Sequence, residues 1–388
     1  MKIRYGEKED FEKAKNIWTE CFTDSEEEVK FYFSNLYKKE NYLVLEDKKD
    51  IKASLYENKY RLNIGGTQFP SFYIVGVAVS PEFRGRGYMK ELLSYSLNNA
   101  KEIGYPFVYL SPINSSIYRN MGFEYISDIE KYNFSMNELI NKKIDRDYYI
   151  KKVELDLIDR YIYDLMDIYT NAMKTFYLYV ERDRETFRNF LSEVFSDGGD
   201  LYIFYRNGDP EGYIVFYKEE KIHVREIFGK NKHVIDTMFG FLKTFKEYYK
   251  DIEIRTPVRQ ELNFYFANQK KIERKIEPFI MGRIIDPVPF LEKIAEKNLN
   301  IKIRIDDSVV TSNSGFYTLT EGKVIFSETG SWDIRVDIGD LVQLLFGYST
   351  FEELVFRDKI QINDDEIFKK LKKNDVFRIQ KNYIGDYQ

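Results

Sequence analysis

The first 140 residues alternate between strand-like and helix-like patterns of apolar residues. Short apolar runs predict strands, and apolar residues that recur every three or four positions predict helices. Strands are expected at 2–5, 42–46, 51–56, 72–79 and 107–110, and helices at 10–22, at 89–100 and, briefly, up to Tyr118. Gly104 is a natural stop for the helix at 89–100, since glycine readily closes helices. This order predicts an α/β or α+β unit.

A similar order returns after residue 143. Helices are expected at 157–176, 185–195 and 234–249, with strands at 201–205, 213–218, 223–228 and 252–256. The repetition suggests an ancient duplication. Pro287 and Pro289 mark the segment 285–290 as a candidate linker. Beyond it, strands at 301–306, 315–319, 323–327 and 334–338 and helices at 338–346, 350–356 and 364–371 predict a small α+β domain. We therefore expect three domains, at 1–142, 143–285 and 286–388.

Composition narrows the class of protein. Hydrophobic residues make up 43% of the 388 residues and charged residues 32%, which is typical of a folded chain. The 59 Lys and Arg against 64 Asp and Glu give a net charge of −5, which argues against a nucleic-acid partner and favours a cationic small substrate. The 32 Tyr, 31 Phe and 2 Trp can build cores, pockets or subunit contacts, and composition alone does not choose among these.

Cysteine usage and the absence of apolar segments suggest a location. Cys21 is the only cysteine, so no internal disulfide is expected, and no Cys/His cluster has the spacing of a metal site. The chain starts without an apolar leader, and its longest mostly apolar stretch, 69–79, is shorter than the roughly 20 residues of a membrane helix. We expect a cytoplasmic protein with no metal and no membrane partner, and a packing role for Cys21.

The segment most informative about chemistry follows the strand at 72–79. After Val77, Ala78 and Val79, the chain reads Arg84-Gly85-Arg86-Gly87-Tyr88-Met89 and enters a helix. Free N–H groups at a helix start, the positive end of the helix dipole and two arginines predict an anion site. The alternative is a plain turn with solvated charges. The loop lacks the Gly-Lys-Ser/Thr ending of a P-loop, and its spacing does not fit the dinucleotide fingerprint.

The order strand, loop, helix, strand, followed by Tyr118-Arg-Asn-Met-Gly122-Phe123, resembles the GNAT acyltransferase superfamily over about 140 residues. The resemblance implies that acetyl-CoA is the cosubstrate. It also implies which residues hold it. The backbone of Val77, Ala78 and Val79 would meet the pantetheine arm, the pyrophosphate would lie in the loop 83–88, and two further residues would line the site. The loop residues are Arg84, Gly85, Arg86, Gly87 and Tyr88, and the two others are Ile113 and Asn114. Met89 departs from the family pattern, which has a small residue there.

Nearly the whole chain resembles the enhanced intracellular survival (Eis) acetyltransferases. The features are a first GNAT domain, a second domain with Gly229-Lys-Asn-Lys in place of the Arg-x-x-Gly loop, and the C-terminal stretches 333–341, 344–348 and 382–388. The resemblance implies an α+β protein with two tandem GNAT folds, the second degenerate, and a small sterol-carrier-like α+β domain at the end. It also implies a homo-oligomer such as a hexamer.

By the same resemblance, Tyr118 would be the general acid and the main-chain carboxylate of Gln388 the base. An α-carboxylate, with a pKa near ~3.5, is a poor base for an ammonium group unless burial or a water relay helps, so orienting the amine is its better role. Tyrosine, with a pKa near ~10, suits donation to a thiolate. The alternatives are a structural Tyr118, a frayed terminus, and Glu82 or Glu124 as the base.

The sequence therefore favours an N-acetyltransferase that moves an acetyl group from acetyl-CoA to a primary amine of an aminoglycoside, lysine or polyamine-like acceptor. One alternative is a lipid or hydrophobic-ligand carrier that uses the last domain, with the GNAT part as a non-catalytic scaffold. Another is an interaction protein whose aromatic surfaces serve assembly. The intact loop from Arg84 to Tyr88 argues against loss of activity.

Overall fold

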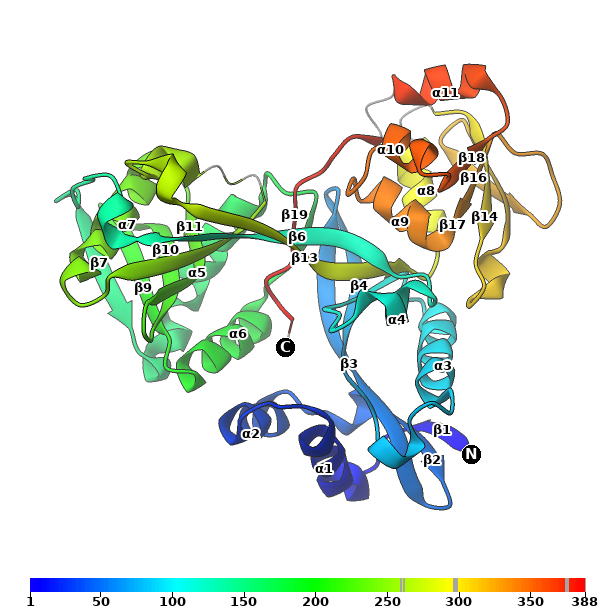
Figure 1. The fold of residues 1–388 in the computed structure, drawn as a ribbon, viewed down its shortest axis with the longest axis horizontal. Helices are drawn as coiled ribbons and strands as arrows, with labels where there is room; N and C mark the ends of the chain where they lie inside the picture. The colour runs from blue at the N-terminus through cyan, green and yellow to red at the C-terminus, as the bar shows by residue number, and fades with distance from the viewer. Residues whose placement is uncertain (259, 261, 296–298, 374–376, 388) are drawn as a thin grey trace. The chain divides into compact units, whose positions relative to one another are not determined.

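The computed structural model describes residues 1–258, 260, 262–295, 299–373 and 377–387. These residues form two compact units (Figure 1). The first unit contains residues 1–24, 36–127 and the described residues from 279 onward, and the second contains 25–35 and 128–278. No described helix combines the length and apolar surface needed to cross a lipid bilayer.

The first unit is built on a sheet in the strand order β1-β2-β3-β4-β5-β13. Neighbours are antiparallel except β4 and β5, which run parallel. The helices of this part are α1 (Phe11–Cys21), α3 (Tyr88–Glu102) and α4 (Ser115–Arg119). The strands are β1 (Lys2–Tyr5), β2 (Tyr42–Asp47), β3 (Asp50–Ile64), β4 (Thr67–Val79), β5 (Phe107–Leu110) and β13 (Glu273–Ile284).

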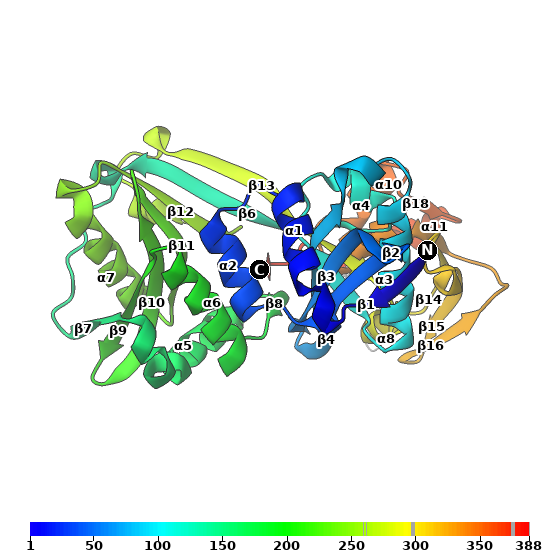
Figure 2. The same cartoon turned by 90° about the horizontal axis from the view of Figure 1, so that it is seen from below.

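Helices α1 and α3 both pack on the central strands β3 and β4 (Figure 2). The apolar face of α3 contributes Leu92, Leu93 and Leu97, each at most 1% exposed. Burying a leucine side chain stabilises a fold by roughly 2 kcal/mol, so this face fixes α3 on the sheet. The N-terminal loop of α3 is thereby held at the end of β4.

The sterol-carrier-like part of the first unit has its own sheet, in the order β16-β15-β14-β17-β18. Its strands are β14 (Ile301–Asp306), β15 (Gly315–Thr320), β16 (Lys323–Ser327), β17 (Ile334–Asp337) and β18 (Ile360–Ile362). Its helices are α8 (Val288–Ala295), α9 (Ile338–Leu345), α10 (Phe351–Phe356) and α11 (Asp365–Lys372), and β19 (Asn382–Tyr383) follows.

The second unit repeats the first sheet, in the order β7-β9-β10-β11-β12-β6, with β11 and β12 parallel. Figure 2 shows its strands between α7 on one side and α5 and α6 on the other. The helices are α2 (Glu26–Asn35), α5 (Ile158–Met173), α6 (Arg184–Ser196) and α7 (Lys232–Lys243). The strands are β6 (Glu124–Ser135), β7 (Tyr148–Val153), β8 (Leu178–Val180), β9 (Asp200–Arg206), β10 (Asp209–Lys218), β11 (Ile222–Gly229) and β12 (Asp251–Pro257).

The two repeats exchange their last strands. In the first unit, Met281–Ile284 of β13 pair with β5, although β13 follows the second repeat in the chain. In the second unit, residues 129–135 of β6 pair with β12, although β6 follows the first repeat. Helix α2 also packs in the second unit, against α6. Each sheet is therefore completed by a strand from the other half of the sequence.

The predicted α+β class, the repeat of the first domain and the small final domain are confirmed. The segment 285–290 is different from what we expected: Ile285 is 0% and Phe290 4% exposed, and Pro289 is the second residue of α8. Proline is tolerated in the first turn of a helix, because the N–H groups there have no partner within the helix. The two prolines therefore start a buried helix and do not form an exposed linker.

Candidate active site

The central strands β4 and β5 of the first unit separate partway along β4. Their parallel register runs from Ser71 opposite Phe107 to Tyr73 opposite Tyr109, whereas β4 continues to Val79. Within the described residues, the end of β4 is thus paired on one side only, with β3. Backbone groups on the other side are available to a ligand that adds to the edge of the strand.

A bulge in β4 lies just beyond the point of separation. The register between β3 and β4 shifts between Ser54 and Tyr56, and Gly76 has a φ of +60°. A Cβ atom at Gly76 would lie 2.5 Å from the ring of Trp18 in α1, so only glycine fits this position. The bulge re-aims the end of β4, residues 77–79, away from the regular pleat.

The loop after β4 forms an open cradle at the start of α3. Gly85 and Gly87 have φ values of +76° and +84°, and a Cβ atom built on either would meet nothing within 4 Å. Gly87 is the N-cap residue of α3, and Arg84, Gly85, Arg86 and Gly87 are all exposed. The first N–H groups of a helix have no partner within it and carry the positive end of the dipole. The open loop at this helix start is therefore compatible with the anion site that the sequence predicts.

Arg84 also fixes the loop to the end of β4. Its Nε donates to the main-chain oxygen of Val79 at 3.2 Å, and the Cys21 Sγ lies 3.6 Å from the same oxygen. Since the N–H and C=O of a strand residue point to the same side, the Val79 N–H also points away from β3. Cys21, which we expected only to pack, is half-buried and lies 3.8 Å from the Arg84 guanidinium.

A third cation stands beside the loop. The Lys52 ammonium lies 3.9 Å above the ring of Phe83, and the Arg86 guanidinium lies 5.2 Å from the same ring. Arg86 also donates to the main-chain oxygen of Glu82 at 3.3 Å. The cation–π contact leaves the charge of Arg86 in place, whereas Lys52 also forms an ion pair with Asp50 at 2.5 Å. Sequence reasoning missed Lys52, which comes from the preceding strand β3.

Tyr118 lies on α4 and is 9% exposed. Its main-chain oxygen accepts from the N–H groups of Met121, at 2.9 Å, and Phe123, at 3.2 Å, and its ring packs edge-on against Phe123. Gly122 closes the turn with a φ of +77°. Burial raises the pKa of the Tyr118 hydroxyl to about 12, because the phenolate would lose its hydration. The side chain is therefore a neutral donor at physiological pH.

The structure also shows the surroundings of the other site residues and alternative bases that the sequence suggested. Ile113 is 88% exposed, and the Asn114 side chain caps α4 by accepting from the Ser116 N–H at 3.0 Å. Glu124, the alternative base, is bound by Arg119 at 2.8 Å. Glu82, the other alternative base, is exposed in a short 3-10 helix over Pro81–Phe83. Glu124 is thus committed to an ion pair.

The last described residues lie in the first unit. The Tyr109 hydroxyl of β5 donates to the main-chain oxygen of Asp386 at 3.3 Å, and the ring of Tyr387 packs edge-on against Phe279 of β13 at 4.9 Å. Asp386 is 1% exposed. Gln388, for which we predicted a chemical role, lies outside the described residues.

The corresponding loop of the second unit is closed. Asn231 caps α7 by accepting from the Val234 N–H at 3.1 Å, and a Cβ atom at Gly229 would lie 2.6 Å from Val234. Lys230 forms an ion pair with Asp167, and Lys232 lies 2.7 Å from Asp236. The charges that could bind an anion are therefore already neutralised by the protein's own carboxylates.

Comparisons with known protein families match three parts of the chain. Residues 2–126 match an acetyltransferase (GNAT) domain, residues 178–284 match a second acetyltransferase (GNAT) domain, and residues 282–380 match a sterol carrier protein domain. A comparison with curated protein sequences finds no match.

Three solved structures share the fold over the full length of this chain. A GCN5-related N-acetyltransferase from Anabaena variabilis is 18% identical, with a TM-score of 0.82 and 100% of both chains covered. A probable N-acyltransferase from Enterococcus faecalis is 20% identical, with a TM-score of 0.85 and 100% and 99% covered. Eis1 from Mycobacterium abscessus is 15% identical, with a TM-score of 0.80 and 100% of both chains covered.

The fold and the domain matches define this chain as a GNAT-type acyltransferase. It has two GNAT domains followed by a sterol-carrier-like domain, and over its full length it is similar in fold to Eis1.

Proposed function

We propose that this chain is an acetyl-CoA-dependent N-acetyltransferase whose first GNAT domain carries out the reaction. The acceptor is a primary amine of an aminoglycoside, a lysine side chain or a polyamine-like molecule. The observation that carries the proposal is the contrast between the two loops: the loop at Arg84–Tyr88 is open and cationic, whereas the one at Gly229–Lys232 is filled and neutralised.

The residues of the first loop fit acetyl-CoA. Arg84 and Arg86, with the backbone N–H groups of the loop, would hold the pyrophosphate. The open space at Gly85 and Gly87 lets the backbone approach so bulky an anion. The side of Val77, Ala78 and Val79 that does not pair with β3 would offer backbone groups such as the Val79 N–H to the pantetheine arm, while the Val79 carbonyl is used by Arg84. Tyr88, Ile113 and Asn114 would complete the site. When bound, the coenzyme supplies a thioester-linked acetyl group.

Tyr118 is the proposed general acid. The acceptor nitrogen attacks the thioester carbonyl, a C–N bond forms, and the C–S bond breaks with the electron pair on sulfur. A thiol has a pKa of roughly 8.5, so complete proton transfer from a phenol of pKa about 12 to a free thiolate is unfavourable. Tyr118 therefore donates a hydrogen bond to the developing thiolate, and the proton that sulfur finally gains is balanced by the one that the amine loses.

Gln388 is the proposed acceptor-side group. The Asp386 main-chain oxygen contacts Tyr109, on the strand that flanks the separation of β4 and β5. A carboxylate there would attract the cationic amine and pass its proton to water, because its low pKa makes it a weak base but a good anionic partner.

The charge balance supports a cationic acceptor. With a net charge of −5, the chain attracts polyamines and repels nucleic acid by its long-range field. The homo-oligomer that the Eis resemblance implies, such as a hexamer, and the cytoplasmic location expected from the cysteine and apolar content belong to the same proposal, as do the domain boundaries at residues 142 and 285.

The proposal is tested by thiol release. Purified protein, acetyl-CoA and a panel of amines should give free coenzyme A at a rate that depends on both substrates, and mass spectrometry should find an acetylated amine. Tyr118→Phe should lower kcat by about a hundred-fold, as expected for loss of a hydrogen-bond donor to the charge that develops in the transition state. If no amine in a panel of aminoglycosides, lysine peptides and polyamines is acetylated, the proposal is wrong.

A further inference from the structure

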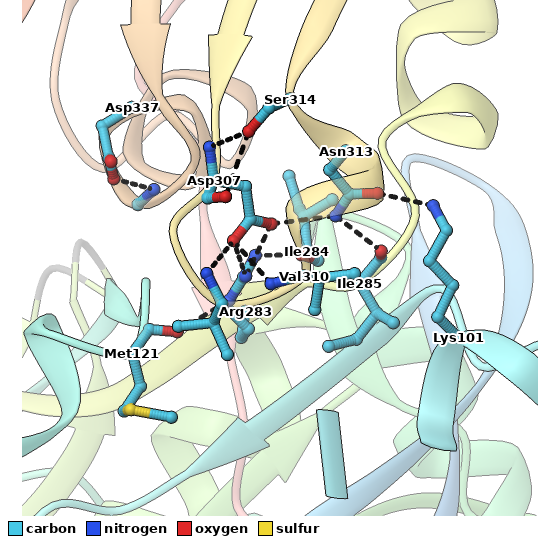
Figure 3. Close-up of polar contacts among 12 residues, drawn as sticks. Lys101, Met121, Arg283, Ile284, Ile285, Asp307, Val310, Asn313, Ser314 and Asp337 are labelled. Atoms are coloured by element: carbon cyan, nitrogen blue, oxygen red, sulfur yellow. Dashed lines mark hydrogen bonds and ion pairs between the residues drawn. The ribbon is translucent and has the colours of Figure 1, made fainter. Parts of the chain in front are cut away.

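A fully buried arginine lies where the exchanged strand β13 ends. Arg283 is 0% exposed, and its Nη2 donates to both carboxylate oxygens of Asp307 at 2.7 Å (Figure 3). Its Nη1 donates to the main-chain oxygen of Ile284. A buried charge is costly unless it is paired and its donors are used, and here each outer nitrogen has a partner.

The remaining donor of this guanidinium reaches the turn after α4. The Arg283 Nε donates to the main-chain oxygen of Met121 at 2.9 Å. Gly122, the next residue, lies so close that a Cβ atom there would be 2.8 Å from the same Nε. The side chain of Ile338 in α9 closes the other side of Gly122, at 2.9 Å from that Cβ position. Arg283 and the sterol-carrier-like domain therefore hold this turn from two sides.

That turn carries Tyr118. The Met121 N–H donates to the Tyr118 main-chain oxygen at 2.9 Å. Met121 therefore bonds to Arg283 through its carbonyl and to Tyr118 through its N–H. The Phe123 N–H donates to the same oxygen at 3.2 Å. A displacement of Met121 would move the backbone of Tyr118 directly.

The sterol-carrier-like domain fixes the other partner of the arginine. The Asp307 Oδ1 accepts from the N–H groups of Val309 and Val310, both at 3.0 Å, and its Oδ2 accepts from the Asn313 amide at 2.9 Å. The Asn313 side chain also accepts from Lys101 at the end of α3 (Figure 3). Asp307 is thus oriented by its own loop, and Arg283 cannot shift without breaking several bonds at once.

We propose that Arg283 is a positioning residue for acyl transfer: through Met121 it fixes the turn that carries Tyr118, and Asp307 makes the sterol-carrier-like domain part of that support. The inference rests on the proposed role of Tyr118. It gives the last domain a function in the reaction that needs no lipid ligand. A guanidinium is suited to this role because its rigid fork serves a carboxylate and a carbonyl together, whereas an ammonium is a single point charge.

The test is a double-mutant cycle with Arg283→Lys and Tyr118→Phe. Arg283→Lys keeps the charge for Asp307 but loses the fork, and we expect kcat to fall about ten- to a hundred-fold with the KM for acetyl-CoA unchanged. In the Tyr118→Phe background the same change should have almost no further effect, because there is no hydroxyl left to position. Hydrogen exchange in the peptide around 118–123 should become faster in Arg283→Lys.

Arg182→Lys is the matched control. Arg182 is also a buried arginine held by a carboxylate, with its guanidinium nitrogens 2.9 and 2.6 Å from the two Glu226 oxygens in the second unit. We expect it to lose stability but to leave exchange in 118–123 unchanged. If Arg283→Lys does not fold, Asp307→Asn tests the same support, because it weakens the pair that orients the Arg283 guanidinium without changing the turn itself.

The outcomes separate the two proposals. The positioning role would be overturned if the losses in kcat multiply in the double variant, or if hydrogen exchange in 118–123 is unchanged in Arg283→Lys. Either result would leave the proposed function standing. An unchanged Tyr118→Phe enzyme would instead refute the acid role itself, and the positioning role with it.

Discussion

The hydroxyl of Tyr109 donates to the main-chain oxygen of Asp386 at 3.3 Å, and both residues are at most 1% exposed. One lies on β5, beside the point where β4 and β5 separate, and the other lies 277 positions later in the chain. The ring of Tyr387 adds a contact with Phe279 of β13. The end of the described chain is therefore part of the core of the first unit, and changes there should affect the first GNAT domain.

We expect that five glycine and serine residues added after Gln388 suppress turnover. The extension moves the free carboxylate away from the acceptor but leaves the contacts of Asp386 and Tyr387 possible. Steady-state kinetics should show a fall in kcat/KM for the amine of about ten-fold or more, the size typical of proton-transfer assistance. Calorimetry should show unchanged acetyl-CoA affinity. Equal turnover in the extended and original chains would exclude the carboxylate of Gln388 from the reaction.

Gly87 and Gly104 form a matched pair at the two ends of α3. Their φ values are +84° and +83°, and neither has an atom within 4 Å of an added Cβ. Alanine at either position should cost about 1 kcal/mol of unfolding free energy, from backbone strain alone. Only Gly87→Ala should also weaken acetyl-CoA binding, because Gly87 lies in the proposed pyrophosphate loop. Denaturant unfolding and calorimetry would check this, and equal binding losses in both variants would contradict the site.

The elements around the loop at Arg84–Tyr88 could be predicted because their signals are local patterns in the sequence. Helix α3 was expected over 89–100 and extends over Tyr88–Glu102. It could be predicted because its apolar face and the glycines that flank it all lie within one short stretch of sequence. The acidic start of the helix at 364–371 is likewise confirmed: Asp364 caps α11 by accepting from the Glu366 N–H. The loop and Tyr118 were found for the same reason, since each is a short contiguous motif.

Elements that depend on distant partners were missed. Helix α2 was not predicted, although Val29, Tyr32 and Phe33 have helical spacing and are buried. Strands β6 and β13 were not predicted, because their partners lie in the opposite repeat and nothing local indicates an exchange. One signal for Arg283 was readable: it is the only charged residue in the stretch 279–285. A charge within an apolar strand indicates a buried ion pair.

The pH dependence of kcat/KM should reflect the ionisation of the acceptor amine and not that of Tyr118. Because burial raises the pKa of Tyr118 to about 12, its hydroxyl stays protonated, and active as a donor, at every pH below about 11. The acceptor amine must instead lose its proton, so kcat/KM should rise with pH towards the amine's own pKa near ~10. Kinetics between pH 6 and 10 check this. A descending limb near pH 9 to 10 that disappears in Tyr118→Phe would show an ordinary tyrosine pKa and contradict the burial argument.

A buried carboxyl in α9 makes the stability depend on pH. Burial raises the pKa of Asp340 from 3.8 to about 6, although Lys359 lies 3.5 Å from it. The folded protein therefore binds this proton more tightly than the unfolded chain, so the group stabilises the fold at low pH, and this stability is lost as pH rises from about 4 to 6. The shift corresponds to roughly 3 kcal/mol when complete.

Asp340→Asn should consequently raise the unfolding free energy at pH 7.5, by up to about 3 kcal/mol, and make much less difference at pH 4.5. Urea unfolding at the two pH values measures the effect. Asp358→Asn is the control, because Asp358 is exposed and has a φ of +56°, which asparagine also accepts. A variant at 340 that is less stable than the original protein at pH 7.5 would show that the pair with Lys359 outweighs the burial.

The central claim is that the open loop of the first GNAT domain, and not the closed loop of the second, binds the coenzyme. Calorimetric titration of acetyl-CoA into the full chain tests this most directly, because it counts sites and needs no acceptor. We expect one site per chain, lost or weakened by about ten-fold or more in Arg84→Gln and unchanged in Lys230→Gln. No binding, or two sites per chain, would contradict the account.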